Sequence, residues 1–184
     1  MSRPASDLPE RAVQAAIELA GRTGVRNVTF DAVAERVGAS KGAVLHHFRT
    51  KGALLDAMVA SLLAVHREAL DAARAADPEP VGAFARALLT VASPSDRMTE
   101  RGLLSVLLEE PERAGAVHAY WRWCHDRLAA DGLTPGQAAL IMLASDGAWY
   151  TELLGLPMPS EDAMAEGRSI LDAMTRHNAP QSEQ

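Results

Sequence analysis

The chain has 184 residues, 48% of them apolar but only 4% aromatic, so its core must consist mainly of Ala, Leu and Val, a composition typical of helices. A single cysteine, Cys124, excludes a disulfide framework and a four-cysteine zinc site within one chain. The net charge of −6 is unevenly spread: residues 1–52 carry eight Lys and Arg against five Asp and Glu, which indicates a basic module that meets an anion and an acidic body that does not.

The sequence shows neither a signal peptide at its start nor an apolar run long enough to span a membrane. The first ten residues, MSRPASDLPE, lack the apolar core of a signal peptide. No apolar run approaches the roughly 18 residues that a membrane span needs. We therefore expect a soluble, cytoplasmic protein.

Apolar residues at helical spacing predict about nine helices and no strand. The first begins near Asp7, in D-L-P-E, and ends at Gly21 and Gly24. A threonine or serine that caps a helix precedes several of the others. The remaining helices are expected after Thr29 as far as Val37, then at 41–48, after Thr50 to about 76, and at 81–92, 98–108, 111–130, 135–155 and 161–177.

Between two of the short helices, residues 38–42 read GASKG, which has the G-x-S-x-G spacing of the turn that carries a serine hydrolase nucleophile. That turn follows a strand, whereas the preceding FDAVAERV has helical spacing. The alternative is a tight turn between two helices, in which Gly38 adopts a positive φ and Ser40 caps the second helix. This is a helix-turn-helix, whose second helix lies in the major groove of DNA.

Residues 8–60 resemble the TetR family of bacterial transcriptional regulators, most densely in GASKGAVLHHFRTKGALLDAM. The shared pattern is S-K-G, then H-H-F, then a lysine three residues after the phenylalanine. The resemblance implies an all-α fold in which a three-helix DNA-binding module, here 1–52, is linked by a long fourth helix to a ligand-binding and dimerisation bundle, here 53–184. The family's usual tyrosine before the two histidines is absent, and Leu45 stands there.

The resemblance also implies which residues contact DNA. Phosphate contacts are expected from Thr29, Ser40, His47 and Lys51. Base edges are expected to face Lys41, Gly42, Ala43, Leu45 and His46; among them Lys41 can reach a guanine, whereas Ala43 and Leu45 can make only apolar contacts. The alternative for Ser40 is a cap alone.

The sequence of the C-terminal part indicates its function less specifically. In HAYWRWCHDRL the aromatic residues belong either to a bundle core or to the lining of a cavity for an apolar or aromatic effector. Asp146 lies on an apolar helix stripe, so its carboxylate needs a partner, either an arginine of the same chain or a polar group of the ligand. The candidate ligand-binding residues are Met58, Leu62, Leu104, Trp121, Cys124, His125, Met142, Asp146 and Trp149.

The helix QAALIMLASDGAWYTELLG is apolar nearly all round, which predicts burial on both sides. One side can meet its own core and the other a second copy of the chain. Glycines within this helix and the next one favour close helix approach. The expected homodimer interface consists of Leu140, Leu143, Gly147, Leu154, Gly167, Ile170, Leu171 and Met174.

Together these patterns predict a homodimeric, ligand-responsive transcriptional repressor that a small molecule releases from a near-palindromic operator in double-stranded DNA. One alternative is a helix-turn-helix protein without an effector. A remote alternative is an all-α enzyme, but the chain has no Glu-x-x-His pair, no G-x-x-x-x-G-K-[ST] phosphate loop and no C-x-x-C. We expect no enzymatic activity, no cofactor and no metal.

Overall fold

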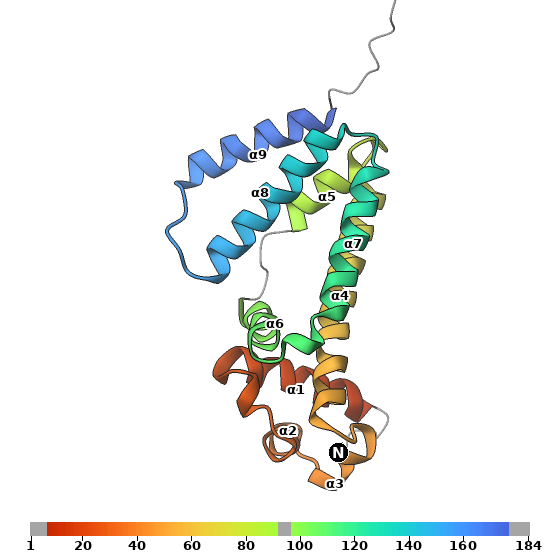
Figure 1. Ribbon diagram of the computed structural model, residues 1–184, viewed down its shortest axis with the longest axis vertical. Helices are drawn as coiled ribbons and strands as arrows, with labels where there is room; N and C mark the ends of the chain where they lie inside the picture. Colours follow the sequence, from red (N-terminus) through yellow and green to blue (C-terminus); the bar gives the residue numbers. More distant parts are fainter. Residues whose placement is uncertain (1–6, 92–96, 177–184) are drawn as a thin grey trace, which may run out of the picture. The chain divides into compact units, whose positions relative to one another are not determined.

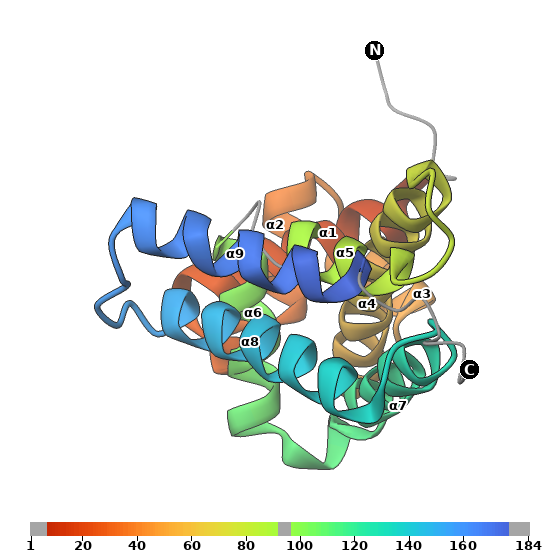
Figure 2. The same ribbon diagram turned by 90° about the horizontal axis from the view of Figure 1, so that it is seen from above.

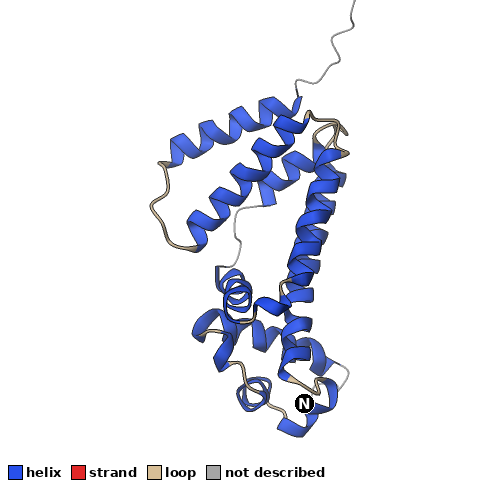
Figure 3. Ribbon diagram, in the orientation of Figure 1, coloured by secondary structure: helices blue, strands red, loops and turns tan. Residues whose placement is uncertain are grey.

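The computed structural model describes residues 7–91 and 97–176, and in these ranges all regular structure is helical (Figures 1 and 3). The all-α prediction is thus confirmed. None of the described helices is long and apolar enough to cross a membrane. The α-helices are α1 (Leu8–Thr23), α2 (Phe30–Val37), α3 (Lys41–His47), α4 (Lys51–Ala76), α5 (Ala83–Val91), α6 (Arg97–Glu109), α7 (Gly115–Ala129), α8 (Pro135–Leu153) and α9 (Glu161–Arg176), with short 3₁₀ turns η2 (Val25–Asn27) and η3 (Pro111–Arg113).

The chain forms two compact units, and each is built from two separate stretches of sequence. Unit 1 comprises Met1–Val65 with Ser95–Ala119, and unit 2 comprises His66–Pro94 with Tyr120–Gln184. The boundaries after Val65 and Ala119 fall inside helices, so α4 and α7 each contribute to both units. These are packing units, and the functional division at residue 52 stays a prediction.

In unit 1, α6 packs against α1, although more than seventy residues separate them in the chain. The two helices lie close together at Gly102, where a Cβ atom would stand 3.1 Å from the backbone oxygen of Ile17. The buried face of α1 suits this approach because it consists mainly of alanines. Its buried residues are Leu8, Ala12, Ala15, Ala16, Ile17 and Ala20.

Polar contacts tie α6 to the turn η2 that follows α1. The Val25 N–H donates to the Ser105 hydroxyl at 2.8 Å, and the Arg26 guanidinium pairs with Glu109 at 2.7 Å. Ser105 in turn donates to Glu109 at 3.0 Å. The end of α6 therefore holds both a backbone group and a side chain of η2.

Two details of the predicted helices differ from the structure. Asp7 precedes α1, but its side chain makes no capping hydrogen bond, and the helix runs through Gly21 to Thr23 before Gly24, at φ 85°, ends it. The predicted helix at 111–130 is divided into η3 and α7, because Pro111 opens a 3₁₀ turn that closes with a hydrogen bond from the Ala114 N–H to the Pro111 oxygen.

In unit 2, α5 packs against α8 and α9, which lie side by side in Figures 1 and 2. Helix α5 begins at Ala83, two residues later than predicted, because a residue from elsewhere in the chain caps it. The buried Asp131 carboxylate accepts the N–H groups of Phe84 at 3.1 Å and Ala85 at 2.9 Å. A distant carboxylate thus satisfies backbone donors that the first turn of a helix leaves open.

A buried arginine joins three elements of unit 2. Arg86 on α5 donates from Nε and Nη2 to Asp77, just beyond α4, at 2.6 and 2.9 Å, and from Nη1 to the Thr175 hydroxyl on α9 at 3.0 Å. These hydrogen bonds from Arg86 lower the pKa of Asp77 to about 2. The pair satisfies a charge that would otherwise be buried without compensation.

Candidate nucleic-acid interface

The sequence GASKG forms the turn between α2 and α3. Gly38 ends α2 in the left-handed conformation, at φ 68° and ψ 37°, and the Ala39 N–H bonds back to Ala34 at 2.9 Å. No atom lies within 4 Å of the position of a Cβ on Gly38, so it is the backbone conformation and not a lack of space that favours glycine here. Because a helix and not a strand precedes Ser40, the hydrolase interpretation is excluded, and the two helices form a helix-turn-helix.

The two hydroxyls predicted to contact phosphates both cap helices. Thr29 accepts the N–H of Ala32 at 3.2 Å, and Ser40 accepts the N–H of Ala43 at 3.1 Å. Both residues are exposed, and a hydroxyl that accepts such a bond still has its own hydrogen to donate. Capping and phosphate contact are therefore compatible roles.

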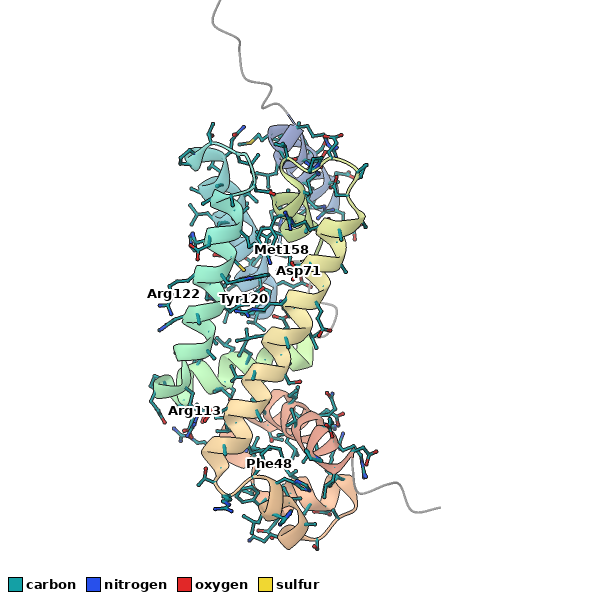
Figure 4. All side chains as sticks on the ribbon, turned by 90° about the vertical axis from the view of Figure 1, so that its right-hand side faces the viewer. Phe48, Asp71, Arg113, Tyr120, Arg122 and Met158 are labelled. Atoms are coloured by element: carbon teal, nitrogen blue, oxygen red, sulfur yellow. The ribbon has the colours of Figure 1, made fainter. Side chains whose placement is uncertain are left out.

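One face of α3 is buried and the other is open. Val44 is fully buried, and Phe48, which follows the last residue of α3, packs in the core of unit 1 (Figure 4). Around this anchor the predicted base-facing residues reach solvent: Lys41, Gly42 and His46 are exposed, and Ala43 and Leu45 are half-buried. His47, predicted at a phosphate, is exposed too.

Two lysines, Lys41 at the start of α3 and Lys51 at the start of α4, are engaged within unit 1. The Lys41 ammonium lies 2.7 Å from the carboxylate of Asp31 on α2. The Lys51 ammonium donates to the backbone oxygens of Val25 at 2.9 Å and Arg26 at 3.2 Å. Two of the three N–H donors of Lys51 thus hold η2, so the predicted phosphate contact would have to use the third.

Arg49 is a candidate DNA contact that the sequence motifs do not single out. It is exposed, it lies between the buried Phe48 and the capping Thr50, and it has no hydrogen-bond or ion-pair partner among the described residues. Arg36, by contrast, pairs with Glu18. The one signal in the sequence that could have identified Arg49 as a candidate is its position directly before Thr50, which caps α4.

The predicted ligand-binding residues are divided between the two units. Met58, Leu62 and Leu104 belong to unit 1, and Met58 and Leu62 are buried there. The other six belong to unit 2 and differ widely in burial: Cys124 and Met142 are buried, Trp121, Asp146 and Trp149 are half-buried, and His125 is exposed. Their assignment to a ligand site stays a prediction.

Asp146 has the most unusual environment of these six residues. Burial raises its pKa to about 6, an effect that the nearby charge of His125 partly offsets. Among the described residues no arginine pairs with Asp146, so the expected arginine partner is absent from this part of the chain. The second expectation, a polar group of a ligand, stays a prediction.

The aromatic residues of α7 pack mainly with the residues around them. Tyr120 is buried and points toward α4 in Figure 4, whereas Arg122 points away. Trp123 lies between two guanidinium groups, at 4.9 Å from Arg67 and 5.0 Å from Arg127. Burial raises the pKa of the Cys124 thiol to about 11, so it is protonated and unreactive at neutral pH. For Tyr120 and Cys124 the core interpretation is thus the one that the packing favours.

Four of the residues predicted for the dimer interface are exposed apolar side chains on α8, directly after it or on α9, whereas Leu171 and Met174 are half-buried. Leu143 is 68% exposed, and Leu140, Leu154 and Ile170 are each more than half exposed. No atom lies within 4 Å of a Cβ position on Gly147 or Gly167, so neither glycine is needed for packing within the chain. A surface of this kind is typical of a protein–protein contact.

Two family models match the chain. The one described as bacterial regulatory proteins, tetR family, matches residues 12–58, and the one described as tetracyclin repressor-like, C-terminal domain, matches residues 82–176. Over 56 residues the chain is 41% identical to the tetracycline repressor protein class A from transposon 1721 of Escherichia coli. This match covers 30% of the chain but only 26% of that repressor.

Solved structures share the fold. A transcriptional regulator from Saccharomonospora viridis in complex with choline is 19% identical, with a TM-score of 0.74 over 94% of this chain and 97% of that one. A regulator from Rhodococcus sp. Rha1 is 24% identical, with a TM-score of 0.66 over 91% and 95% of the two chains. The multidrug binding protein EbrR complexed with ethidium is 21% identical, with a TM-score of 0.65 over 91% and 98%. Because the C-terminal model alone spans more than half of the sequence and the N-terminal model coincides with the helix-turn-helix, the chain belongs to the TetR family of bacterial transcriptional regulators.

Proposed function

We propose that this protein is a homodimeric repressor that binds a near-palindromic operator through α3 and releases it when a small molecule binds to the C-terminal part. The observation that carries the proposal is the arrangement of α3. Val44 and Phe48 anchor this helix in unit 1, while Lys41, His46 and Arg49 reach solvent beside it. A short helix held from one side and polar on the other is the form that enters a major groove.

The contacts divide by chemistry. The hydroxyls of Thr29 and Ser40 donate to phosphates, and His47 and Arg49 add further phosphate contacts that fix the position of α3. Lys41 faces a base edge, where an ammonium pairs best with guanine O6 and N7. Gly42 and Ala43 let the helix approach the bases, and Leu45 offers only an apolar surface.

A second copy of the chain completes the DNA-binding protein. A helix-turn-helix dimer binds two half-sites about one helical turn apart, so the partner subunit must fix the separation of the two α3 helices. The exposed leucines of α8, with Ile170 on α9, are the surface that we assign to this partner. Gly147 and Gly167 leave room there for the close approach of another helix.

We infer that the effector is an apolar or aromatic compound that carries a positive charge. This charge pairs with the carboxylate of Asp146. The carboxylate is half-buried and has no arginine partner among the described residues, so a cationic ligand would satisfy it. Two structural neighbours, crystallised with choline and with ethidium, hold cations of this chemical kind. The effector releases DNA only if it binds the DNA-free arrangement more tightly than the DNA-bound one.

Selection of duplexes from a random library by the full-length protein, followed by fluorescence anisotropy, tests this function. We expect the selected sequence to be a near-palindrome and to bind at least about 10³-fold more tightly than random DNA. The variant Lys41→Ala should lower the preference for the selected sequence, and wild-type protein on random DNA is the control. Equal, weak binding of selected and random duplexes would show that α3 does not recognise sequence.

A further inference from the structure

An ion pair spans the helix-turn-helix. Asp31 lies in the first turn of α2, two residues after the capping Thr29, and Lys41 is the first residue of α3. The Lys41 ammonium and the Asp31 carboxylate are 2.7 Å apart, and both side chains are more than half exposed. The pair therefore places a negative charge on the same surface as the proposed DNA contacts.

This negative charge changes what Lys41 can contribute to DNA binding. While the pair is intact its net charge is near zero, so it adds little attraction to a phosphate backbone of any sequence. To contact a phosphate, the ammonium would exchange one anion for another and leave Asp31 unpaired and facing the DNA. Such an exchange gains little attraction, and it adds repulsion between the Asp31 carboxylate and the DNA phosphates.

A contact with a base edge does not require the Lys41 ammonium to leave Asp31. The ammonium has three N–H donors, so Lys41 can keep one bond to Asp31 and donate the other two to guanine O6 and N7. The carboxylate then holds the ammonium in place and is itself neutralised. The ion pair is thus compatible with base recognition and unfavourable to phosphate binding.

We propose that Asp31 determines specificity: it weakens binding to DNA of unrelated sequence and directs Lys41 to a base edge of the operator. The inference rests on the proposed function, because it requires α3 to lie in the major groove. It assigns a DNA-recognition role to an acidic residue, which acts on DNA through Lys41 and not by direct contact.

The test compares Asp31→Asn with the wild type in the full-length protein, on the selected operator and on a random duplex, by anisotropy between 50 and 200 mM salt. For random DNA we expect tighter binding of the variant, by roughly three- to tenfold, because Lys41 becomes free to neutralise a phosphate. The salt dependence should then steepen by about 0.9 in log K against log salt for each α3. Operator affinity should not rise by the same factor, so the ratio of operator to random affinity should fall.

Glu35→Gln is the matched control. Glu35 is exposed on the same helix, about one turn further along, and has no side-chain partner among the described residues, so its removal changes the net charge equally but frees no lysine. A second control places Asp31→Asn in a Lys41→Ala background, where random-DNA affinity should rise no more than in Glu35→Gln. Thermal unfolding of each variant confirms that it is folded; an exposed ion pair contributes little to stability.

The possible results separate the two proposals. If the wild type fails to distinguish selected from random DNA, the proposed function is wrong and the role of Asp31 with it. If the wild type discriminates but Asp31→Asn keeps the full ratio, or behaves like Glu35→Gln, only the role of Asp31 is wrong. A lower ratio in Asp31→Asn alone supports the specificity role.

Discussion

Removal of Arg49 gives the most direct measure of the proposed DNA contacts. Its side chain is exposed and has no partner among the described residues, so Arg49→Ala removes no intramolecular contact that the structure shows. Substitutions at such surface positions usually change the free energy of unfolding by no more than about 0.5 kcal/mol. A loss of DNA affinity in this variant would therefore report on the contact with DNA.

The expected size follows from the number of phosphates neutralised. Each phosphate contact steepens the dependence of log K on log salt by about 0.9. Between 50 and 200 mM salt, one contact corresponds to a factor of about 3.5 in affinity, and the two Arg49 residues of a dimer correspond to a factor of about 12. The wild type should lose that much more affinity over this range than Arg49→Ala does.

The assay is fluorescence anisotropy on the selected operator at several salt concentrations, with Arg36→Ala as the matched control. Arg36 also carries one positive charge in unit 1, but it pairs with Glu18, so its removal should leave the slope nearly unchanged. An unchanged slope in Arg49→Ala would refute the phosphate contact. An equal reduction of the slope in the two variants would show that net charge, and not the position of Arg49, sets the salt dependence.

Three further predictions concern unit 2 and its surface. Leu143→Asp should convert the dimer into folded monomers in analytical ultracentrifugation. The control variant Leu108→Asp, at a similarly exposed leucine of α6, should leave the dimer intact. Dimers in both variants would show that the interface lies elsewhere. Asp131→Ala leaves two buried N–H groups without an acceptor and should lower the free energy of unfolding by about 3 kcal/mol in urea titrations. The control variant Asp126→Ala, on the exposed face of α7, should change this free energy little. A small effect at both positions would contradict the capping role of Asp131. The pKa of Asp146 is about 6 when folded and 3.8 ordinarily, so ionisation opposes folding: the penalty is absent below pH 3.8, grows up to pH 6 and is complete above it. Asp146→Asn should therefore be more stable than the wild type at pH 8 and should flatten the pH dependence of thermal unfolding between pH 4 and 7; parallel pH profiles would contradict this.

Local sequence signals predicted the helix-turn-helix well because its determinants are local. Thr29, Ser40 and Thr50 each cap the helix that directly follows them, and Gly38 adopts the positive φ that its position required. In each case the hydrogen bond joins residues only a few positions apart. The residue types and their spacing within a short segment are therefore enough to predict where these helices and the turn form.

Partners that are distant in sequence could not be predicted in this way. Lys51 bonds to carbonyl groups about 25 residues earlier, and Asp131 caps α5 by accepting the N–H of Phe84, 47 residues before it. Nothing in the sequence around either residue indicates such a partner, since both contacts depend on how helices pack. The same is true of Asp31 and Lys41, whose pairing depends on how α2 and α3 pack together.

The place of α6 in unit 1 has a consequence for hybrid regulators made by joining the DNA-binding part of one family member to the sensor part of another. A graft that keeps only residues up to the end of α4 would take away Ser105 and Glu109, leaving the Val25 N–H and the Arg26 guanidinium without their partners and the alanine-rich face of α1 uncovered. Arg113, which bonds to Asp56 and to the Gly52 carbonyl at the start of α4, would be lost with them. The transferable cassette is therefore discontinuous in sequence, and a working exchange has to carry residues 97–113 together with the first four helices.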